Sequence, residues 1–178
     1  MLIHKDEIKL DKDDDDDLIE LGKGSAGTVY RGFFRKSMLV AVKKIEVVGL
    51  SLAAATKELN MYHLLAHPKI IRLFGYYTKN SNLFLVLELG NSNLRQLLES
   101  NSSKRLELEK AIVFALHISE AVMFLHGRNI VHLDIKSSNV IICDGQVAKI
   151  TDLGTARKLL TTATQSTLGK SGRGRYHF

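Results

Sequence analysis

The chain has 178 residues, 45% of them hydrophobic, which is enough to bury the core of one domain or of two small lobes. Its formal net charge is +6, but no acidic residue follows Asp152, so the excess charge lies near the end of the chain, which argues against a basic nucleic-acid-binding domain. No run approaches the roughly 18 consecutive apolar residues of a membrane-spanning helix, and the start lacks the apolar stretch of a secretory signal.

The first elements are predicted from charge and from glycine spacing. Residues 1–17 are expected to be an acidic, disordered lead-in, because the five consecutive like charges of Asp13 to Asp17 repel one another. Residues 18–21 and 28–34 are short apolar, β-branched or aromatic segments, which predicts two strands around a turn. The glycines between them are Gly22, Gly24 and Gly27.

A third strand and a helix follow the glycine turn. Residues 38–44 alternate, with valines on one face and Ala41 and Lys43 on the other. Residues 53–66 contain good helix formers, and His67-Pro68 ends them, since the residue before a proline is pushed out of helical geometry. The last two strands of the predicted sheet cover residues 70–77 and 83–87.

The second half of the chain has the pattern of helices and one hairpin. Residues 94–98 predict a short helix and residues 108–126 a long one. The long helix is expected to bury one stripe, made of Ala111, Ala115, Ile118, Val122 and Leu125. Residues 140–142 and 147–150 flank an Asp-Gly pair, which predicts a β-hairpin.

The glycine-rich segment is the first candidate for chemistry. Residues 22–29 fit the pattern G-x-G-x-x-G-x-V, in which positions without side chains let backbone N–H groups approach phosphate oxygens. A dinucleotide-binding fingerprint would have to open a helix, whereas a strand is predicted here. A glycine turn without a ligand remains the alternative for this segment taken alone.

Lys43 and Glu58 are a candidate ion pair. Lys43 ends a strand that is predicted to pair with the glycine hairpin, where an ammonium group can reach phosphates. Glu58 lies in the middle of the first helix and can hold that ammonium group in place. Taken singly, a surface lysine and a solvated helix glutamate are the alternative interpretation.

The most specific block runs from Ile130 to Asn139 and continues after the hairpin with Thr151-Asp152-Leu153-Gly154. It supplies carboxylates, an amide and a lysine from loops next to short strands. Phosphoryl transfer needs this set, because a carboxylate orients the attacking hydroxyl, oxygen atoms bind Mg²⁺, and a cation contacts the migrating group.

These motifs, in this order from about Leu18 to about Leu159, resemble the eukaryotic protein kinases. The resemblance implies an α+β fold, with an antiparallel sheet and one inserted helix in the first lobe and an incomplete, mainly helical second lobe. The expected divisions are residues 18–87 for the first lobe, 88–90 for the hinge, 91–154 for the partial second lobe and 155–178 for a basic, partial activation segment.

The resemblance also implies roles for individual residues, with ATP and Mg²⁺ as cofactors and a protein as substrate. The residues that would act in catalysis are Lys43, Glu58, Asp134 as the base, and Lys136 at the γ-phosphate. The Mg²⁺ ligands would be Asn139 and Asp152. The residues that would bind ATP are Leu21, Gly22, Lys23, Gly24, Ser25, Ala26, Gly27, Val29, Ala41, Lys43, Leu87, Glu88, Leu89, Asn139 and Asp152.

Within this family the chain most resembles the Ser/Thr-directed kinases, because Lys136 follows the predicted base by two places. The His-Leu-Asp-x-Lys run, with Leu168-Gly169, is most similar to the Mos-type kinases. Leu133 stands where many kinases carry an arginine that grips an activation-loop phosphate, so the resemblance does not imply that regulation. Leu153 replaces the phenylalanine of Asp-Phe-Gly. The chain lacks Ala-Pro-Glu and is therefore expected to be truncated within the activation segment.

Three alternatives stay open beside a Ser/Thr protein kinase. One is an ATP-binding regulatory module without phosphoryl transfer, and another is an anionic-surface binder that uses the basic tail. The third, a metal pair of His63 and His67, is disfavoured because Pro68 interrupts the helix and no third ligand joins them. The lone Cys143 cannot form an internal disulfide, which favours a cytoplasmic protein. No membrane partner is expected without a long apolar run, and no nucleic-acid partner without a basic domain.

Overall fold

The computed structural model describes residues 1–24, 27–47, 51–100 and 105–159. Its strands are β1 (Ile8–Leu10), β2 (Glu20–Gly24), β3 (Gly27–Phe34), β4 (Met38–Glu46), β5 (Leu73–Lys79), β6 (Asn82–Glu88), β7 (Ser92–Asn93), β8 (Ile130–Val131), β9 (Val140–Cys143), β10 (Val147–Ile150) and β11 (Arg157–Lys158). Its α-helices are α1 (Ser51–Leu64), α2 (Leu94–Ser100) and α3 (Leu108–His126). Short 3-10 helices cover Lys5–Glu7, Ser137–Asn139 and Asp144–Gln146.

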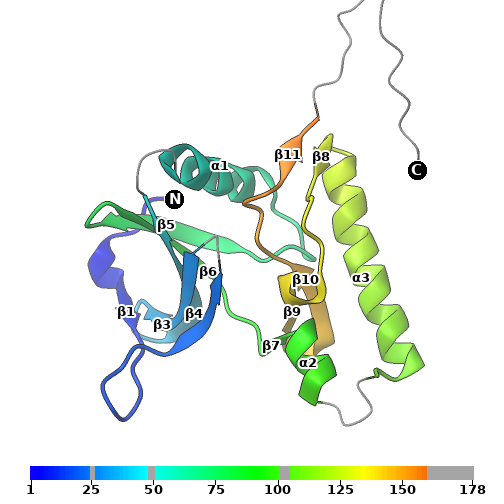
Figure 1. The fold of residues 1–178 in the computed structure, drawn as a ribbon, viewed down its shortest axis with the longest axis horizontal. Helices are drawn as coiled ribbons and strands as arrows, with labels where there is room; N and C mark the ends of the chain where they lie inside the picture. Colours follow the sequence, from blue (N-terminus) through cyan, green and yellow to red (C-terminus); the bar gives the residue numbers. More distant parts are fainter. Residues whose placement is uncertain (25–26, 48–50, 101–104, 160–178) are drawn as a thin grey trace, which may run out of the picture.

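The first part of the chain forms one six-stranded antiparallel sheet (Figure 1). The strand order is β1-β3-β4-β6-β5, and β2 pairs with β3. Alternation along the central strands gives the sheet two apolar faces. Val40 and Val42 of β4 belong to one buried cluster, whereas Leu85 and Leu87 of β6 belong to the other, together with residues of α1. The sheet therefore needs a cover on both sides.

The N-terminal segment covers the face of the sheet that carries Val40 and Val42. The prediction of a disordered lead-in over residues 1–17 was therefore wrong for its first ten residues. Ile3 is buried on the sheet, and β1 pairs with β3 in the register Ile8 to Phe34. Leu2 also forms a bridge with Tyr76 on the opposite edge strand. Burial of apolar side chains offsets the entropy of ordering this segment.

The acidic run itself remains in solvent. Asp13 to Asp17 are all exposed and form the turn between β1 and β2. The Asp13 carboxylate accepts hydrogen bonds from the backbone N–H groups of Asp15 and Asp17, at 3.1 and 3.0 Å. The charges are thus accommodated in a solvated loop, as their mutual repulsion requires.

Helix α1 lies over the other face of the sheet (Figure 1). It begins and ends two residues earlier than predicted, so that His67 falls outside the helix. His63 and His67 therefore do not share a helix face, and the His67 ring packs against Phe124 with centroids 4.5 Å apart. Among the described residues, no group of three or more His, Cys, Asp or Glu side chains could hold a metal ion.

Strand β5 begins later than the predicted strand over residues 70–77. Ile70 and Ile71 are buried, but they pair with the end of β10 and not with the sheet. The Ile71 N–H donates to the Ile150 carbonyl oxygen at 2.9 Å. Apolar character alone could not distinguish these two kinds of burial.

In the second part of the chain, α3 packs against β10 and β8, and α2 packs against β7 and β9 (Figure 1). The predicted hairpin is present as β9 and β10, with Gly145 at φ +71° in its turn. The bounds of α3 are those predicted, but its buried residues are Phe114, Ala121 and Leu125, and Ala115 is exposed. The predicted stripe was thus partly wrong, because neighbouring apolar positions give the helix more than one possible buried face.

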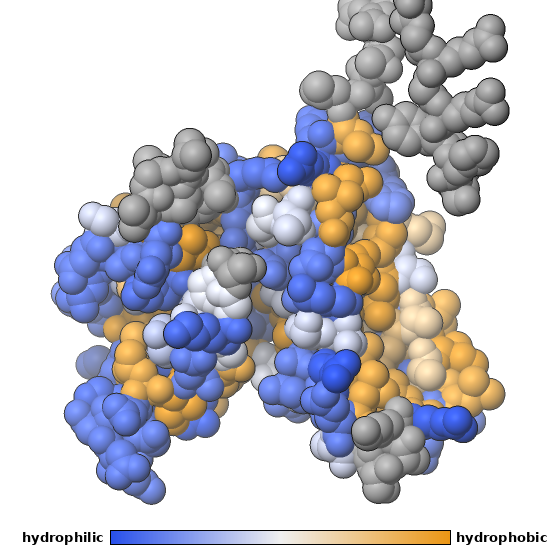
Figure 2. Space-filling view, in the orientation of Figure 1, coloured by the Kyte–Doolittle hydropathy of each residue, from blue (hydrophilic) through white to orange (hydrophobic). Residues whose placement is uncertain are grey.

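The opposite side of α3 carries a row of exposed apolar side chains. Leu108, Ile112, Leu116 and Met123 are 75%, 50%, 57% and 74% exposed. The apolar surface along this helix is visible in the space-filling view (Figure 2). Within the described ranges, no helix is long and apolar enough to cross a membrane.

Candidate active site

A cavity of about 970 Å³ lies between the sheet and the second part of the chain. Loops and strand ends from both parts line it, which places residues far apart in sequence around one space. Of the residues singled out from the sequence, those that line the cavity are Leu21, Gly22, Lys23, Gly24, Gly27, Val29, Ala41, Lys43, Glu58, Leu87, Glu88, Leu89, Asp134, Lys136, Asn139 and Asp152. Ser25 and Ala26 lie outside the described residues.

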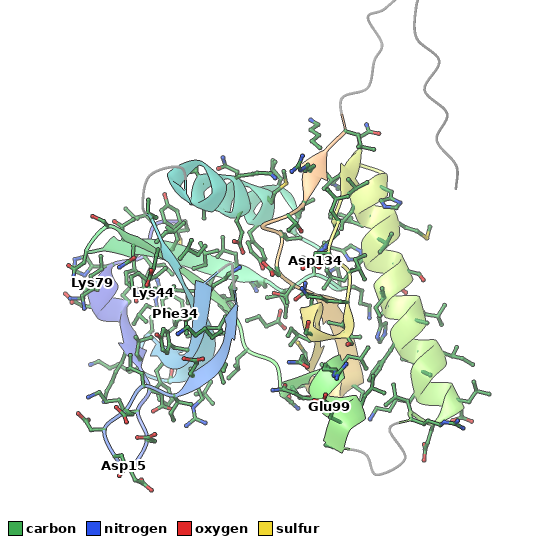
Figure 3. The ribbon with its side chains drawn as sticks, viewed as in Figure 1. Asp15, Phe34, Lys44, Lys79, Glu99 and Asp134 are labelled. Atoms are coloured by element: carbon green, nitrogen blue, oxygen red, sulfur yellow. The ribbon has the colours of Figure 1, made fainter. Side chains whose placement is uncertain are left out.

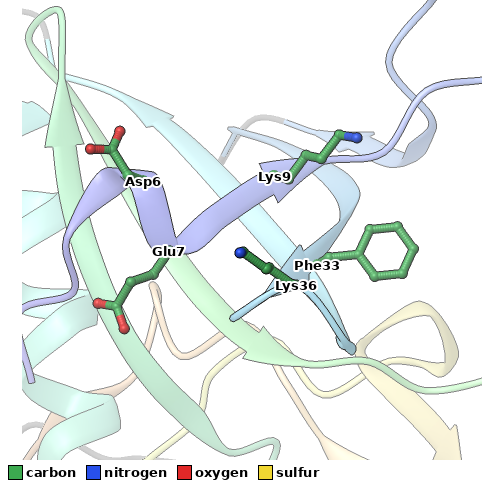
Figure 4. A pocket seen from close by; sticks show the side chains of 5 residues that line it. All are labelled: Asp6, Glu7, Lys9, Phe33 and Lys36. Atoms are coloured by element: carbon green, nitrogen blue, oxygen red, sulfur yellow. The ribbon is translucent and has the colours of Figure 1, made fainter.

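A smaller hollow of about 300 Å³ lies beside β1 (Figure 4). It is lined by Asp6, Glu7, Lys9, Phe33 and Lys36, and it shares no residue with the large cavity. Its charges are of both signs, and no predicted site residue lies in it.

The glycine hairpin of β2 and β3 borders the cavity on the sheet side. Gly24 pairs with Gly27, which has φ +125°. A Cβ atom on Gly27 would lie 2.2 Å from the Lys44 carbonyl oxygen, so this position requires glycine. Gly22 and Gly24 have no atom within 4 Å of such a Cβ position, which leaves their backbone open to the cavity.

Lys43 is buried and joins two carboxylates. Its Nζ lies 2.7 Å from Glu58 Oε1 and 2.9 Å from Asp152 Oδ1. Burial acts to lower the pKa of Lys43, but the charges of Glu58 and Asp152 outweigh it and raise that pKa above its ordinary value. The lysine is therefore charged at neutral pH and links β4, α1 and the segment after β10.

The loop after β8 holds Asp134 between the sheet and α3 (Figure 3). Its Oδ2 accepts hydrogen bonds from Lys136 Nζ at 2.7 Å and from Asn139 Nδ2 at 2.9 Å. The hydrogen bond from Lys136 is the largest effect on the pKa of Asp134, which lies below its ordinary value. Asp134 is therefore ionised at neutral pH and can accept a hydrogen bond from a hydroxyl group.

His132 holds the loop that carries Asp134 in place by hydrogen bonds to two backbone groups. It is 2% exposed, and its Nε2 donates to the Thr151 carbonyl oxygen at 2.9 Å. Its Nδ1 accepts from the Asp134 N–H at 3.3 Å, so the ring joins the Asp134 backbone to the Thr151 backbone. The Thr155 hydroxyl donates to the His132 carbonyl oxygen at 2.8 Å.

Asn139 and Asp152 both line the cavity. Asn139 donates its amide N–H groups to Asp134, which leaves the amide oxygen as an acceptor. The backbone of Thr151, next to Asp152, donates to the Asn139 carbonyl oxygen at 3.0 Å. An amide oxygen and a carboxylate are ligands that Mg²⁺ accepts, so this donor set fits the ion.

The segment from Glu88 to Gly90 connects the two parts of the chain along the cavity. Glu88 forms an ion pair with Lys149 of β10 and accepts from the Arg72 N–H at 3.2 Å. A Cβ atom on Gly90 would lie 2.2 Å from Ile141 Cγ2, so this segment packs closely on β9. Sequence reasoning missed Lys149, which looked like an ordinary polar residue in a hairpin strand.

Comparison with known proteins identifies the family. The protein kinase domain model matches residues 16–172. The chain belongs to the protein kinase family. Among curated relatives, tyrosine-protein kinase Srms of Mus musculus is 36% identical and that of Homo sapiens 31% identical, each over 141 residues. These alignments cover 79% of this chain but 28% and 29% of the relatives, so the chain spans less than a third of their lengths.

The kinase family confirms the α+β fold expected from the motifs. These two relatives support a protein kinase in general and lend no support to the narrower Mos-type resemblance. In this kinase domain Leu153 is fully buried in the cluster that includes α1. Leu133 is exposed, with φ +66°. Leu168 and Gly169 lie outside the described residues.

Proposed function

We propose that the chain forms the ATP-binding and catalytic-loop part of a protein kinase that transfers the γ-phosphoryl group of ATP to a protein hydroxyl. The observation that carries this proposal is the contact of Lys43 with both Glu58 and Asp152 in a cavity that also holds Asp134 and Asn139. Protein kinases use a lysine that is paired with a helix glutamate, beside a glycine-rich loop, to hold the phosphates of ATP.

Each part of the cavity has a distinct task in this proposal. Bound Mg-ATP would supply the phosphoryl group and the positive charge of the metal ion. The glycine hairpin would offer backbone N–H groups to the phosphates, and Lys43 would add an ammonium group. Asn139 and Asp152 would hold the metal ion with their oxygen atoms.

Asp134 would orient the acceptor. Its carboxylate would accept the hydrogen bond of the substrate hydroxyl and receive its proton. Lys136 lies on this carboxylate, with Nζ 2.7 Å from Oδ2, and would stabilise negative charge that develops between Asp134 and the phosphates. The task of both residues is positioning and charge stabilisation, which dominate phosphoryl transfer.

We propose that the acceptor is a serine or threonine hydroxyl. This proposal rests on the position of Lys136, two places after Asp134. Tyrosine is a second candidate, because the two relatives given above carry the name tyrosine-protein kinase. Peptides that differ only in having Ser, Thr or Tyr at one position separate the two, with Asp134→Asn as the inactive control. Phosphate on Tyr alone would contradict the proposed acceptor and leave the kinase activity standing.

The ATP-binding module without transfer would give a different result. It would bind Mg-ATP, and all of the peptides would remain unlabelled even in a chain extended by a kinase C-terminal part. We also propose a cytoplasmic location, supported by the single cysteine, Cys143, which is buried and unpaired.

A further inference from the structure

Helix α1 reaches Asp152 through a second side chain that the proposed function does not use. Tyr62 follows Glu58 by one helical turn, so both side chains lie on the same face of α1. The Tyr62 ring is 5% exposed. Its hydroxyl oxygen accepts a hydrogen bond from the Asp152 N–H at 3.2 Å and lies 3.3 Å from Thr151 Oγ1.

The Tyr62 hydroxyl can serve both neighbours at once. Its oxygen accepts from the backbone of Asp152, so its own hydrogen is free to donate to the Thr151 hydroxyl. The hydroxyl group therefore joins the Asp152 backbone to the Thr151 side chain.

The peptide unit between Thr151 and Asp152 is held at both of its polar ends. Its carbonyl oxygen accepts from His132 Nε2 at 2.9 Å, and its N–H donates to Tyr62. The orientation of this unit sets φ of Asp152, which is +63°. A residue other than glycine adopts this conformation only where its surroundings hold it there.

We propose that Tyr62 is a positioning residue that holds the backbone of Asp152 so that its carboxylate faces Lys43 and the metal position. Helix α1 then contacts Asp152 twice, through Glu58 and Lys43 at the carboxylate and through Tyr62 at the backbone. A displacement of α1 would disturb both contacts together. This inference rests on the proposed function of Asp152 as a metal ligand.

The variant Tyr62→Phe removes one oxygen atom and keeps the ring. Tyr77→Phe is the matched control, because Tyr77 is also 5% exposed but belongs to the cluster on the opposite face of the sheet. The first measurement is amide hydrogen exchange at Asp152 without nucleotide. We expect Tyr62→Phe to speed this exchange by about tenfold, as for the loss of one hydrogen bond, and Tyr77→Phe to leave it unchanged.

The second measurement compares ATP affinity with Mg²⁺ and with EDTA in each variant. The ratio of the two affinities cancels any general loss of stability. We expect Tyr62→Phe to reduce the gain from Mg²⁺ by about tenfold without changing affinity in EDTA, since only the metal ligand is displaced. Tyr77→Phe should have the ratio of the wild-type chain.

The outcomes separate this inference from the proposed function. A wild-type chain that gains affinity from Mg²⁺, together with a Tyr62→Phe variant that matches it in both measurements, would overturn the inference alone. A wild-type chain without any Mg²⁺-dependent ATP binding would overturn the proposed function and the positioning role with it. Faster exchange at Asp152 together with a reduced Mg²⁺ effect in Tyr62→Phe would support both.

Discussion

Lys43 of β4 and Glu58 of α1 form a buried ion pair, with Nζ 2.7 Å from Oε1 and side chains 7% and 4% exposed. Removal of one partner from such a pair leaves the other charge without compensation in a low-dielectric environment. The pair therefore affects folding stability as well as nucleotide binding. The burial of the pair predicts a clear loss of stability when Lys43 is replaced by an apolar residue.

We expect Lys43→Met to lower the free energy of unfolding by about 3–5 kcal/mol at pH 7 and to weaken ATP binding. Burial already raises the pKa of Glu58, and without Lys43 this carboxyl binds a proton more readily in the folded than in the unfolded state. The variant should therefore be more stable at pH 5 than at pH 7. Denaturant unfolding at both pH values measures this difference.

The double variant Lys43→Met/Glu58→Gln is the control for that experiment. It removes both charges of the pair, so part of the stability should return and the extra pH dependence should disappear. Its ATP affinity should remain low. A single Lys43→Met variant as stable as the wild-type chain, with unchanged ATP affinity, would contradict the role of the pair.

Gly27→Ala should distort the glycine hairpin. The added Cβ atom would meet the Lys44 carbonyl oxygen at 2.2 Å, and alanine does not tolerate φ +125°. We expect a loss of about 1–3 kcal/mol in unfolding free energy and weaker ATP binding. Gly24→Ala, where no atom lies within 4 Å, should leave the unfolding free energy nearly unchanged. Equal stability of the two variants would argue against the close approach at Gly27.

Asp134→Asn and Asp152→Asn should separate chemistry from binding. Asp134 orients the acceptor and does not hold the nucleotide, so Asp134→Asn should bind Mg-ATP normally while transfer falls by about 10²–10⁴ in an extended, active chain. Asp152→Asn should lose the effect of Mg²⁺ on ATP affinity as well. Calorimetry and peptide phosphorylation measure the two effects. Equal ATP affinities and equal Mg²⁺ dependence in both variants would show that the roles are assigned wrongly.

The exposed row on α3 should cause self-association. Burial of large apolar patches is favourable, and Ile112 and Met123 are 50% and 74% exposed. We expect Ile112→Lys/Met123→Lys to reduce association at high concentration in analytical ultracentrifugation and to leave ATP affinity unchanged. Association that persists in the double variant would show that another surface mediates it.

Much of the site was predictable because its residues occur in short segments with fixed spacing. The glycine hairpin, the pair of Lys43 and Glu58, and the loop with Asp134 and Asn139 all follow from motifs whose members lie a few residues apart or occur in a set order. The elements that carry these motifs are also strongly patterned. Long α3 and the β9–β10 hairpin appear at the predicted positions.

Contacts between distant segments were not predictable. Tyr62 lies 90 positions before Asp152, and nothing in its neighbourhood distinguishes it from a core tyrosine. Lys149 was missed for the same reason. Strand β1 was missed because its apolar residues are few and alternate with charges next to the acidic run, and its burial depends on a sheet face formed by later strands.

The central claim is that the cavity around Lys43 binds Mg-ATP, and thermal unfolding with increasing ATP in Mg²⁺ tests it most directly. At about 100 times the dissociation constant, ATP should add roughly 2.7 kcal/mol of stability to the wild-type chain, with a smaller effect in EDTA. The Lys43→Met/Glu58→Gln variant should show a much smaller rise in melting temperature at the same ATP concentrations. No rise in the wild-type chain at any ATP concentration, or equal rises in both proteins, would contradict the account.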